Sequence, residues 1–148
     1  MSALIPNVAK GRFAHYATLP AANDALVWLL WTGVETDANV RDTDTVTTMI
    51  ALGVNEATFP GYSRQVATGV VVTVDDTNDR VDVDAADPSW TSTGSEALTR
   101  ISLNYDPDTT GGTDADLVPV FVDDFILSSP ASGVVGYTVA IGGWGRDS

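Results

Sequence analysis

Residues 66–86 read VATGVVVTVDDTNDRVDVDAA, and this stretch decides the fold class. Valine or threonine occupies every second position from 66 to 74, and valine or alanine does so from 81 to 85. Apolar residues at alternate positions are typical of strands that bury one face. The four residues between them, 76–79, favour a turn, because Asp and Asn form local hydrogen bonds and Asn tolerates positive φ. The stretch therefore predicts a β-hairpin.

The side chains of this hairpin also predict its register. A two-residue and a four-residue loop centred on the turn give the same pairs, which are Val74 with Val81, Val72 with Val83, and Asp75 with Arg80. Two apolar pairs and one pair of opposite charge agree on this arrangement. Asp82 and Asp84 then point to the other face, toward water.

A second strand is predicted at residues 25–32, which are apolar on both faces. Alternation places Leu26, Trp28 and Leu30 on one face and Val27, Leu29 and Trp31 on the other. A strand in a two-sheet sandwich usually buries one face only. The second face therefore needs a cover, either from the N-terminal segment or from another subunit. We expect Trp28 and Trp31 to help build a core and a subunit interface.

Further strands are expected at residues 99–105, 117–122 and 134–141. The first strand places Ile101, Leu103 and Tyr105 on one side, and the last places Val135, Tyr137, Val139 and Ile141 on one side. The middle strand is apolar on both sides, but Pro119 makes it an edge or bulged strand, because proline cannot donate a ladder hydrogen bond.

One short helix is predicted at residues 42–52. Val46, Met49, Ile50 and Gly53 fall at helical spacing, with Asp42 or Asp44 as the expected N-cap and Gly53 at the end. The chain is thus expected to be mostly β, as a single-domain β-sandwich or jelly-roll-like fold with one short helix.

Residues 1–23 are expected to form an extended N-terminal arm ahead of a sandwich domain at residues 24–148, because Pro6, Gly11 and Pro20 interrupt any helical period. The arm either lies along its own domain or docks on a neighbouring subunit or other partner. Its candidate partner-binding residues are Lys10, Arg12, Phe13 and Tyr16. Trp144, in the glycine-rich stretch 142–146, covers either its own sheet or a neighbouring subunit.

Composition excludes several classes of partner. The chain has no cysteine, and its formal net charge is −13, with 20 acidic residues against 7 Lys and Arg. Phosphate backbones and anionic lipid surfaces attract basic proteins, so neither nucleic acid nor a membrane is an expected partner. The longest apolar run is far shorter than a membrane-spanning helix, and the first residues lack the pattern of a signal peptide. Only Glu35, Glu56 and Glu96 are Glu, so 17 of the acidic residues are Asp, which is typical of turns.

The sequence offers little for catalysis. Its one histidine, His15, lies in the arm, and the chain lacks the G-x-S-x-G pattern of a nucleophile elbow. Paired carboxylates are numerous, but in a chain so rich in Asp such pairs arise from composition alone. We therefore expect a protein without enzymatic activity and without a cofactor.

Calcium is the metal worth weighing. The loop at residues 106–116 reads DPDTTGGTDAD and brings together Asp106, Asp108, Asp114 and Asp116. Calcium prefers oxygen ligands from a flexible loop, although the spacing is not that of an EF-hand. A long solvated loop between two strands is the simpler interpretation.

Five stretches, in this order along the chain, are similar to a group of small virion proteins of tailed bacteriophages, notably phages of actinobacteria. They are residues 10–12 (KGR), 19–26 (LPAANDAL), 55–58 (NEAT), 74–82 (VDDTNDRVD) and 105–110 (YDPDTT). The resemblance implies a non-enzymatic virion protein. Within that group the labels differ between capsid decoration, head fibre and minor tail protein.

The leading expectation is a capsid decoration, or cement, protein that binds and stabilises the head shell. Proteins of this kind are commonly small β-rich homotrimers, so the resemblance implies the major capsid protein and further copies of the chain as partners. It places the protein on the capsid surface of the virion and, during assembly, in the host cytoplasm. The alternative is a tail or fibre-associated adhesin, or minor tail protein, that binds a host surface glycan.

Overall fold

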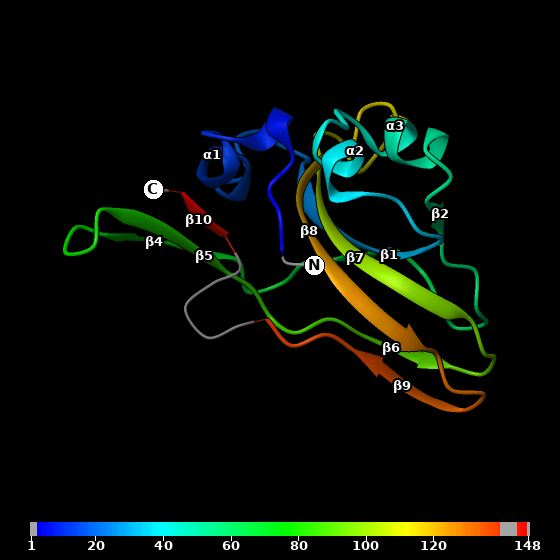
Figure 1. The fold of residues 1–148 in the computed structure, drawn as a ribbon. Helices are drawn as coiled ribbons and strands as arrows, with labels where there is room; N and C mark the ends of the chain where they lie inside the picture. The colour runs from blue at the N-terminus through cyan, green and yellow to red at the C-terminus, as the bar shows by residue number, and fades with distance from the viewer. Residues whose placement is uncertain (1–2, 140–144, 148) are drawn as a thin grey trace.

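The computed structural model describes residues 3–139 and 145–147, and these form a single, mostly β domain (Figure 1). The elements in chain order are η1 (Asn7–Ala9), α1 (Phe13–Ala17), β1 (Ala25–Thr32), α2 (Asp37–Arg41), α3 (Val46–Ala51), β2 (Asn55–Glu56), β3 (Gln65–Val66), β4 (Val71–Asp75), β5 (Arg80–Asp84), β6 (Ser89–Ser92), β7 (Ala97–Asp106), β8 (Val118–Ser128), β9 (Gly133–Gly136) and β10 (Gly145–Asp147). The predicted mostly-β class is confirmed.

The largest sheet has the order β2-β1-β7-β8, and β3 also pairs with β1. β7 contains the strand predicted at 99–105. The prediction for Pro119 is also confirmed, because β8 ends the order of the sheet and is bulged at this residue: Leu103 pairs with Phe121 and Asn104 with Pro119, which leaves Val120 as the extra residue. Leu4 forms an antiparallel bridge with Val122 on β8.

The hairpin of β4 and β5 has the predicted register, with a four-residue turn. Asp79, and not Asn78, takes the positive φ of 50° in that turn. The first predicted strand is shorter than expected, because Gly69 adopts a φ of +63° and divides it. Residues 65–66 form β3 and pair with β1, and β4 begins at Val71.

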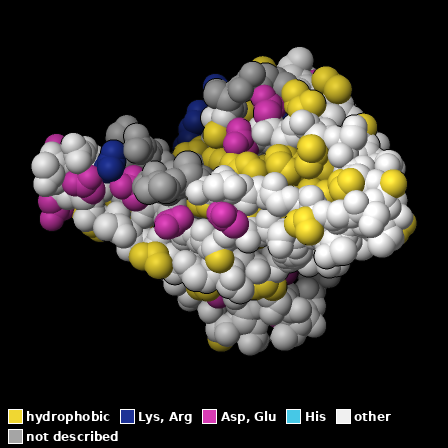
Figure 2. Space-filling model, turned by 90° about the horizontal axis from the view of Figure 1, so that it is seen from below, with side chains coloured by type: hydrophobic (Ala, Val, Ile, Leu, Met, Phe, Trp, Pro, Cys, Tyr) yellow, Lys and Arg dark blue, Asp and Glu magenta, His cyan; other side chains and the backbone are white. Residues whose placement is uncertain are grey.

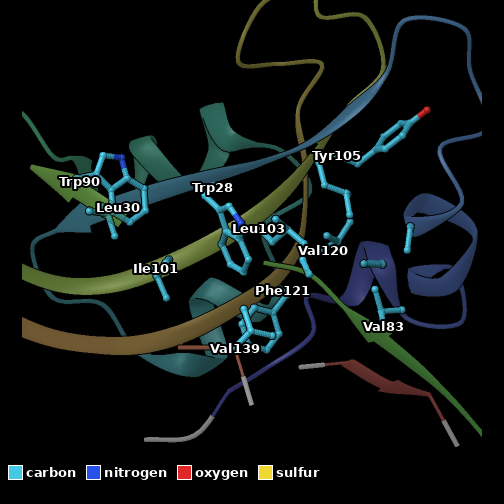
Figure 3. Packing of buried hydrophobic residues seen from close by; sticks show 14 of the residues in the cluster. Trp28, Leu30, Val83, Trp90, Ile101, Leu103, Tyr105, Val120, Phe121 and Val139 are labelled. Atoms are coloured by element: carbon cyan, nitrogen blue, oxygen red, sulfur yellow. The ribbon is translucent and has the colours of Figure 1, made fainter. Parts of the chain in front are cut away.

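The first core lies between one face of the large sheet and a second layer, built from the sheet β10-β5-β4, the pair β6-β9 and the N-terminal helices. Figure 3 shows Trp28, Leu30, Ile101, Leu103 and Phe121 from the large sheet together with Val83, Trp90 and Val139 from the opposite layer. The strand predicted at 134–141 ends at Gly136, although Val139 is still buried. Ile141 lies outside the described residues.

The second core lies on the other face of the large sheet, and the chain itself covers it. Leu29 and Trp31 of β1 pack there against α2, α3 and the N-terminal segment, through Val40, Val46, Met49 and Leu4. Helices on this side of the sheet are visible in Figure 1. The second face of β1 therefore needs no other subunit as its cover.

Polar residues of β7 also lie inside this face. Ser102 and Asn104 are fully buried, and the Trp31 indole Nε1 donates a 2.7 Å hydrogen bond to Ser102 Oγ. Asn104 Nδ2 donates to Ser102 Oγ at 2.8 Å and to the Val27 carbonyl at 3.2 Å. These bonds offset the cost of burying the polar groups.

The predicted helix exists but is shorter, from Val46 to Ala51. Thr45, and not Asp42 or Asp44, is its N-cap, because Thr45 and Thr48 form a reciprocal capping box. Gly53 follows the helix with a φ of +86°, as expected at a helix end. The helix α2 was not predicted; its N-cap Thr36 accepts a hydrogen bond from the Asn39 amide.

The prediction of an extended arm at residues 1–23 is wrong. This segment contains η1 and α1, and Phe13 and Ala17 of α1 are buried in the first core. A five-residue helix has little stability of its own, so the burial of these two side chains stabilises it. The N-terminal segment therefore forms part of the domain packing.

Candidate interaction surfaces

The four candidate residues of the N-terminal segment have different surroundings. Lys10 and Arg12 are exposed. Phe13 is 1% exposed and belongs to the first core, so its predicted role in partner binding is wrong. Tyr16 is half-buried and its ring centroid lies 4.8 Å from that of Tyr105. Only the two cationic side chains and part of Tyr16 therefore form surface.

Tyr105 fixes the chain just ahead of β1. Its hydroxyl donates a 2.8 Å hydrogen bond to Asp24 Oδ2, which also accepts from the Ala21 amide. Burial, followed by the bond to Asp24, raises the pKa of Tyr105 to about 12. This contact positions the N-terminal segment by way of Tyr16, so the exposed Lys10 and Arg12 are held on an ordered part of the domain.

The hairpin of β4 and β5 projects from the body of the domain, and we call it the hairpin limb (residues 71–84) (Figure 1). A hollow of about 310 Å³ at its end is lined by Val74, Asp75, Asp76, Asp79, Arg80 and Val81. Val74 is 65% exposed. Figure 2 shows acidic side chains gathered on this projection, at the left of the view.

Not all charges of the limb are free for a partner. The Asp75 carboxylate accepts from the Thr77 and Asn78 amides and the Asn78 side chain, and the side-chain bond contributes most to lowering its pKa. Arg80 Nε lies 3.2 Å from Asp75 and 3.1 Å from Asp82. These groups stabilise the turn and strand pairing. Asp76 and Asp79 are exposed carboxylates at the tip.

A second surface lies beside β8, and we call it the aliphatic patch (Val34 and Ile126). Val34 is 84% and Ile126 82% exposed. Val34 and Ile126 line a hollow of about 190 Å³ together with Gly33, Thr99 and Arg100. Sequence reasoning missed this patch, although the run Phe125-Ile126-Leu127 directly follows Asp123 and Asp124 and was available as a signal.

The charged residue under this hollow is neutralised from within the chain. Arg100 is buried, and its Nη2 donates to the Glu35 carbonyl at 2.6 Å and to Asp37 Oδ1 at 3.0 Å. Asp124 Oδ1 lies 3.9 Å from its Nη1. The hollow therefore presents aliphatic surface, and the Arg100 guanidinium supports the loop at residues 33–37.

The two tryptophans predicted for a subunit interface are buried inside the chain. Trp28 lies in the first core and Trp31 in the second, and both are among the least exposed side chains. The interface prediction for them is therefore wrong, because both faces of β1 are covered by the chain itself. Trp144 lies outside the described residues.

The four carboxylates considered for calcium have separate roles. Asp106 and Asp108 accept from the amides of Asp108 and Thr110, and Asp116 accepts from the Thr113 amide. Asp114 forms a 2.6 Å ion pair with Arg64. Within residues 3–139 and 145–147, no group of three or more His, Cys, Asp or Glu side chains is placed to hold a metal ion. The calcium set is therefore not brought together.

Arg64 ties this loop to the large sheet. Its guanidinium binds both carboxylate oxygens of Glu56, with Nη2 at 2.6 Å from Oε2, and it also binds Asp114. The hydrogen bonds to Glu56 and then to Asp114 raise the pKa of Arg64. Tyr62 donates to Glu56 Oε1 at 2.7 Å, and its burial, followed by this hydrogen bond, raises the pKa of its phenol. The cluster holds β2, β3 and the 106–116 loop together.

His15 is exposed on α1, with its ring centroid 5.9 Å from that of Tyr16. In the part of the chain that the structure describes, no carboxylate or hydroxyl forms a hydrogen bond with its imidazole. A nucleophile or base of the Ser-His-Asp type needs such partners. The described residues thus bring no catalytic set together around His15.

Comparison of the chain with protein-family models, with curated proteins and with solved structures finds no match to any of them. No helix among the described residues is long and apolar enough to cross a membrane. The surfaces themselves must therefore carry the functional argument.

Proposed function

We propose that this chain is a structural protein of a bacteriophage virion, namely a capsid decoration protein that binds and stabilises the head shell. The resemblance of five short stretches of its sequence to small virion proteins of tailed phages suggests this class. The observation that carries the proposal is the aliphatic patch, where Val34 and Ile126 are exposed beside a hollow of about 190 Å³.

The patch supports docking because the two cores do not need it. Both faces of the large sheet are already filled, so the fold gains little from leaving a valine and an isoleucine more than 80% exposed. Contiguous exposed apolar patches mark interaction sites more often than single exposed side chains do. Each large side chain that becomes buried contributes roughly 1.5–3 kcal/mol. In this proposal the patch contacts the major capsid protein.

Location on the shell also accounts for the acidic composition. A decoration protein is present at high local density, and a net charge of −13 keeps unattached copies soluble and apart. Docking then depends on a local apolar contact that outweighs screened repulsion. The proposed partners are the major capsid protein and further copies of this chain, the expected assembly is a homotrimer, and the proposed location is the virion surface.

The test measures binding to capsids assembled without the protein. Ile126→Asp with Val34→Asp should abolish cosedimentation with the capsids and remove the rise in capsid melting temperature that the unchanged protein causes. Val134→Asp with Val71→Asp is the matched control, because these valines are 67% and 55% exposed, lie on other strands, β9 and β4, and add the same two carboxylates. Full binding by the patch variant would refute docking through this surface.

A tail or fibre-associated adhesin or minor tail protein remains the alternative. It predicts few copies per particle and direct binding to host-surface glycans on an array. Carbohydrate sites commonly use exposed aromatic rings, whereas Val34 and Ile126 provide aliphatic surface. Many copies per virion with no glycan binding would favour decoration.

A further inference from the structure

The basic side chains within residues 3–139 fall into two groups. Arg64, Arg80 and Arg100 each form an ion pair with at least one carboxylate of the chain. Lys10, Arg12 and Arg41 are exposed and form no ion pair within residues 3–139. In a chain with 20 acidic residues, unpaired cations are unexpected. Two of the three lie within three residues, immediately before α1.

The apolar face of the hairpin limb is buried near its base and exposed near its tip. The pair Val72 and Val83 lies on the same face as the pair Val74 and Val81, because directly opposed residues two positions apart share a face. Val83 is fully buried in the first core with Phe13 of α1, whereas Val74 is 65% exposed. One continuous apolar face is thus covered by its own chain near the body and uncovered at the tip.

The uncovered end suits a cationic side chain with a long aliphatic stem. Val74 and Val81 supply apolar walls to the hollow of about 310 Å³, and Asp76 and Asp79 supply carboxylates at its rim. Lys and Arg side chains commonly lay their methylene groups on apolar surface while the charged end reaches a carboxylate. A two-stranded hairpin is also only marginally stable by itself, so a contact at the tip would stabilise it.

We propose that the tip of the hairpin limb docks on the N-terminal segment of a second copy of this chain, with Lys10 and Arg12 of that copy placed against Val74, Asp76 and Asp79. The contact is between copies because the tip projects away from the body, while α1 lies over the base of the limb (Figure 1). Opposite charges on the two surfaces select this occupant over the acidic remainder of the molecule.

The two contacting surfaces differ, so the contact is heterologous. A heterologous contact closes into a ring when the rotation between copies is suitable, and otherwise it continues as an open filament. A closed ring of three would give the homotrimer expected for a decoration protein. This inference rests on the self-association within the proposed function and is independent of capsid binding through the aliphatic patch.

The test measures the mass of the purified protein by light scattering and sedimentation velocity. The hairpin variant is Asp76→Lys with Asp79→Asn; asparagine is used at 79 because the residue has a φ of 50°, which Asn tolerates. The N-terminal variant is Lys10→Glu with Arg12→Glu. Each should weaken self-association by about tenfold or more, because attraction at the contact is lost or becomes repulsion.

Matched controls separate the contact from net charge. Asp42→Asn with Asp44→Lys makes the same charge change as the hairpin variant in the loop before α3, and Arg41→Glu reverses the third unpaired cation. Both controls should assemble like the unchanged protein. A chain that carries the hairpin and N-terminal substitutions together has the sign of both surfaces reversed, with one cation at the tip opposite two carboxylates on the N-terminal segment, and should recover part of the assembly.

Salt provides a measurement that needs no variant. Raising NaCl from about 50 mM to about 0.5 M should weaken assembly of the unchanged protein, because salt screens exposed ion pairs. The proposal is overturned if the unchanged protein is monomeric at about 100 µM, if the two variants assemble normally, or if the chain with both sets of substitutions recovers no assembly. If the unchanged protein does not self-associate but still binds capsids, this contact is refuted and the decoration proposal is not. If it self-associates through this contact but does not bind capsids, the decoration proposal is refuted and this contact is not.

Discussion

Trp31 gives the most direct test of how the large sheet is built. Its indole is fully buried in the second core and donates a 2.7 Å hydrogen bond to Ser102 Oγ. Trp31→Phe removes that donor and part of the ring while retaining an aromatic side chain. Ser102→Ala removes the acceptor and leaves the buried indole N–H without a partner. The two substitutions and their combination form a double-mutant cycle.

The expected free energies follow from the contacts. Trp31→Phe should cost about 2 kcal/mol, of which about 1 is the hydrogen bond and about 1 is lost packing. Ser102→Ala should cost about 2 kcal/mol, because burying an unpaired indole N–H is unfavourable and Asn104 also loses an acceptor. The double variant should cost about 1 kcal/mol less than the sum, since neither group is then left alone.

Urea unfolding monitored by circular dichroism measures these costs. For an m-value of about 2 kcal/mol/M, each single substitution should lower the midpoint by about 1 M. Low protein concentration and high salt keep self-association from contributing to the apparent stability. A shift below about 0.25 M for Trp31→Phe, together with a change in assembly, would mean that Trp31 lies at a surface and that the second core is described wrongly.

Three further outcomes are expected. In the hairpin, Val83→Ala should lower the free energy of unfolding by about 2 kcal/mol, because Val83 is buried. Val74→Ala on the same face should lower it by under about 0.5 kcal/mol in the monomer, because Val74 is exposed. Equal costs in a denaturant titration would mean that Val74 at the tip is buried as well. Gly61→Ala should cost about 3 kcal/mol or more, since its Cβ would collide with the Thr91 carbonyl oxygen at a φ of +98°, while the control Gly53→Ala should cost about 1 kcal/mol, from its positive φ alone; similar melting temperatures for the two would contradict the close approach of these chains. Burial and the bond to Asp24 raise the pKa of Tyr105 to about 12 from an ordinary value of 10.0, so the folded state retains the phenol proton longer than the unfolded state, and stability that is present below pH 10 should fall as pH rises toward 12. This fall should be shallower in Tyr105→Phe, and an unchanged slope would argue against a raised pKa of Tyr105.

The hairpin shows what local sequence can determine. Its register depends on direct neighbours across two strands, so Val72 opposite Val83 and Asp75 opposite Arg80 could be derived from the residues alone. The start of the first hairpin strand could not be derived in this way. Gly69 interrupts the expected strand by adopting a positive φ, and Val66 pairs with β1, which is distant in the sequence. Strand partners of that kind depend on tertiary packing.

The second core was not predicted from the sequence because it contains polar residues of β7. Arg100, Ser102 and Asn104 alternate along β7 in a way that indicates a solvated face, yet all three are buried. They are accommodated because Trp31, the Val27 carbonyl and Asp37 provide partners from other elements. Alternation alone cannot distinguish a wet face from a buried polar one, and the prediction of Trp31 as an interface residue failed for that reason.

The prediction of an extended N-terminal arm was wrong for a different reason. A helix of five residues at Phe13–Ala17 leaves no usable periodicity and forms because Phe13 and Ala17 are buried in the first core. The aliphatic patch was missed as well, because the run Phe125-Ile126-Leu127 shows that apolar residues are adjacent but not that Ile126 is exposed, which depends on how the strands around it pack.

The distribution of acidic residues connects the fold to the proposed assembly. Asp75, Asp108 and Asp116 each accept hydrogen bonds from nearby amides, so much of the acidity is a consequence of how the turns are made. Asp76 and Asp79 lie in the same turn as Asp75, but their carboxylates accept no hydrogen bond from an amide in the described structure. Aspartate is common in turns, so the formation of the turn is itself sufficient to explain these residues. Within residues 3–139, Lys10 and Arg12 form no ion pair with a carboxylate. Lys10 and Arg12 on one surface and Asp76 and Asp79 on another are thus charges of opposite sign without an ion pair in the described structure, which is the arrangement that the proposed contact between copies requires.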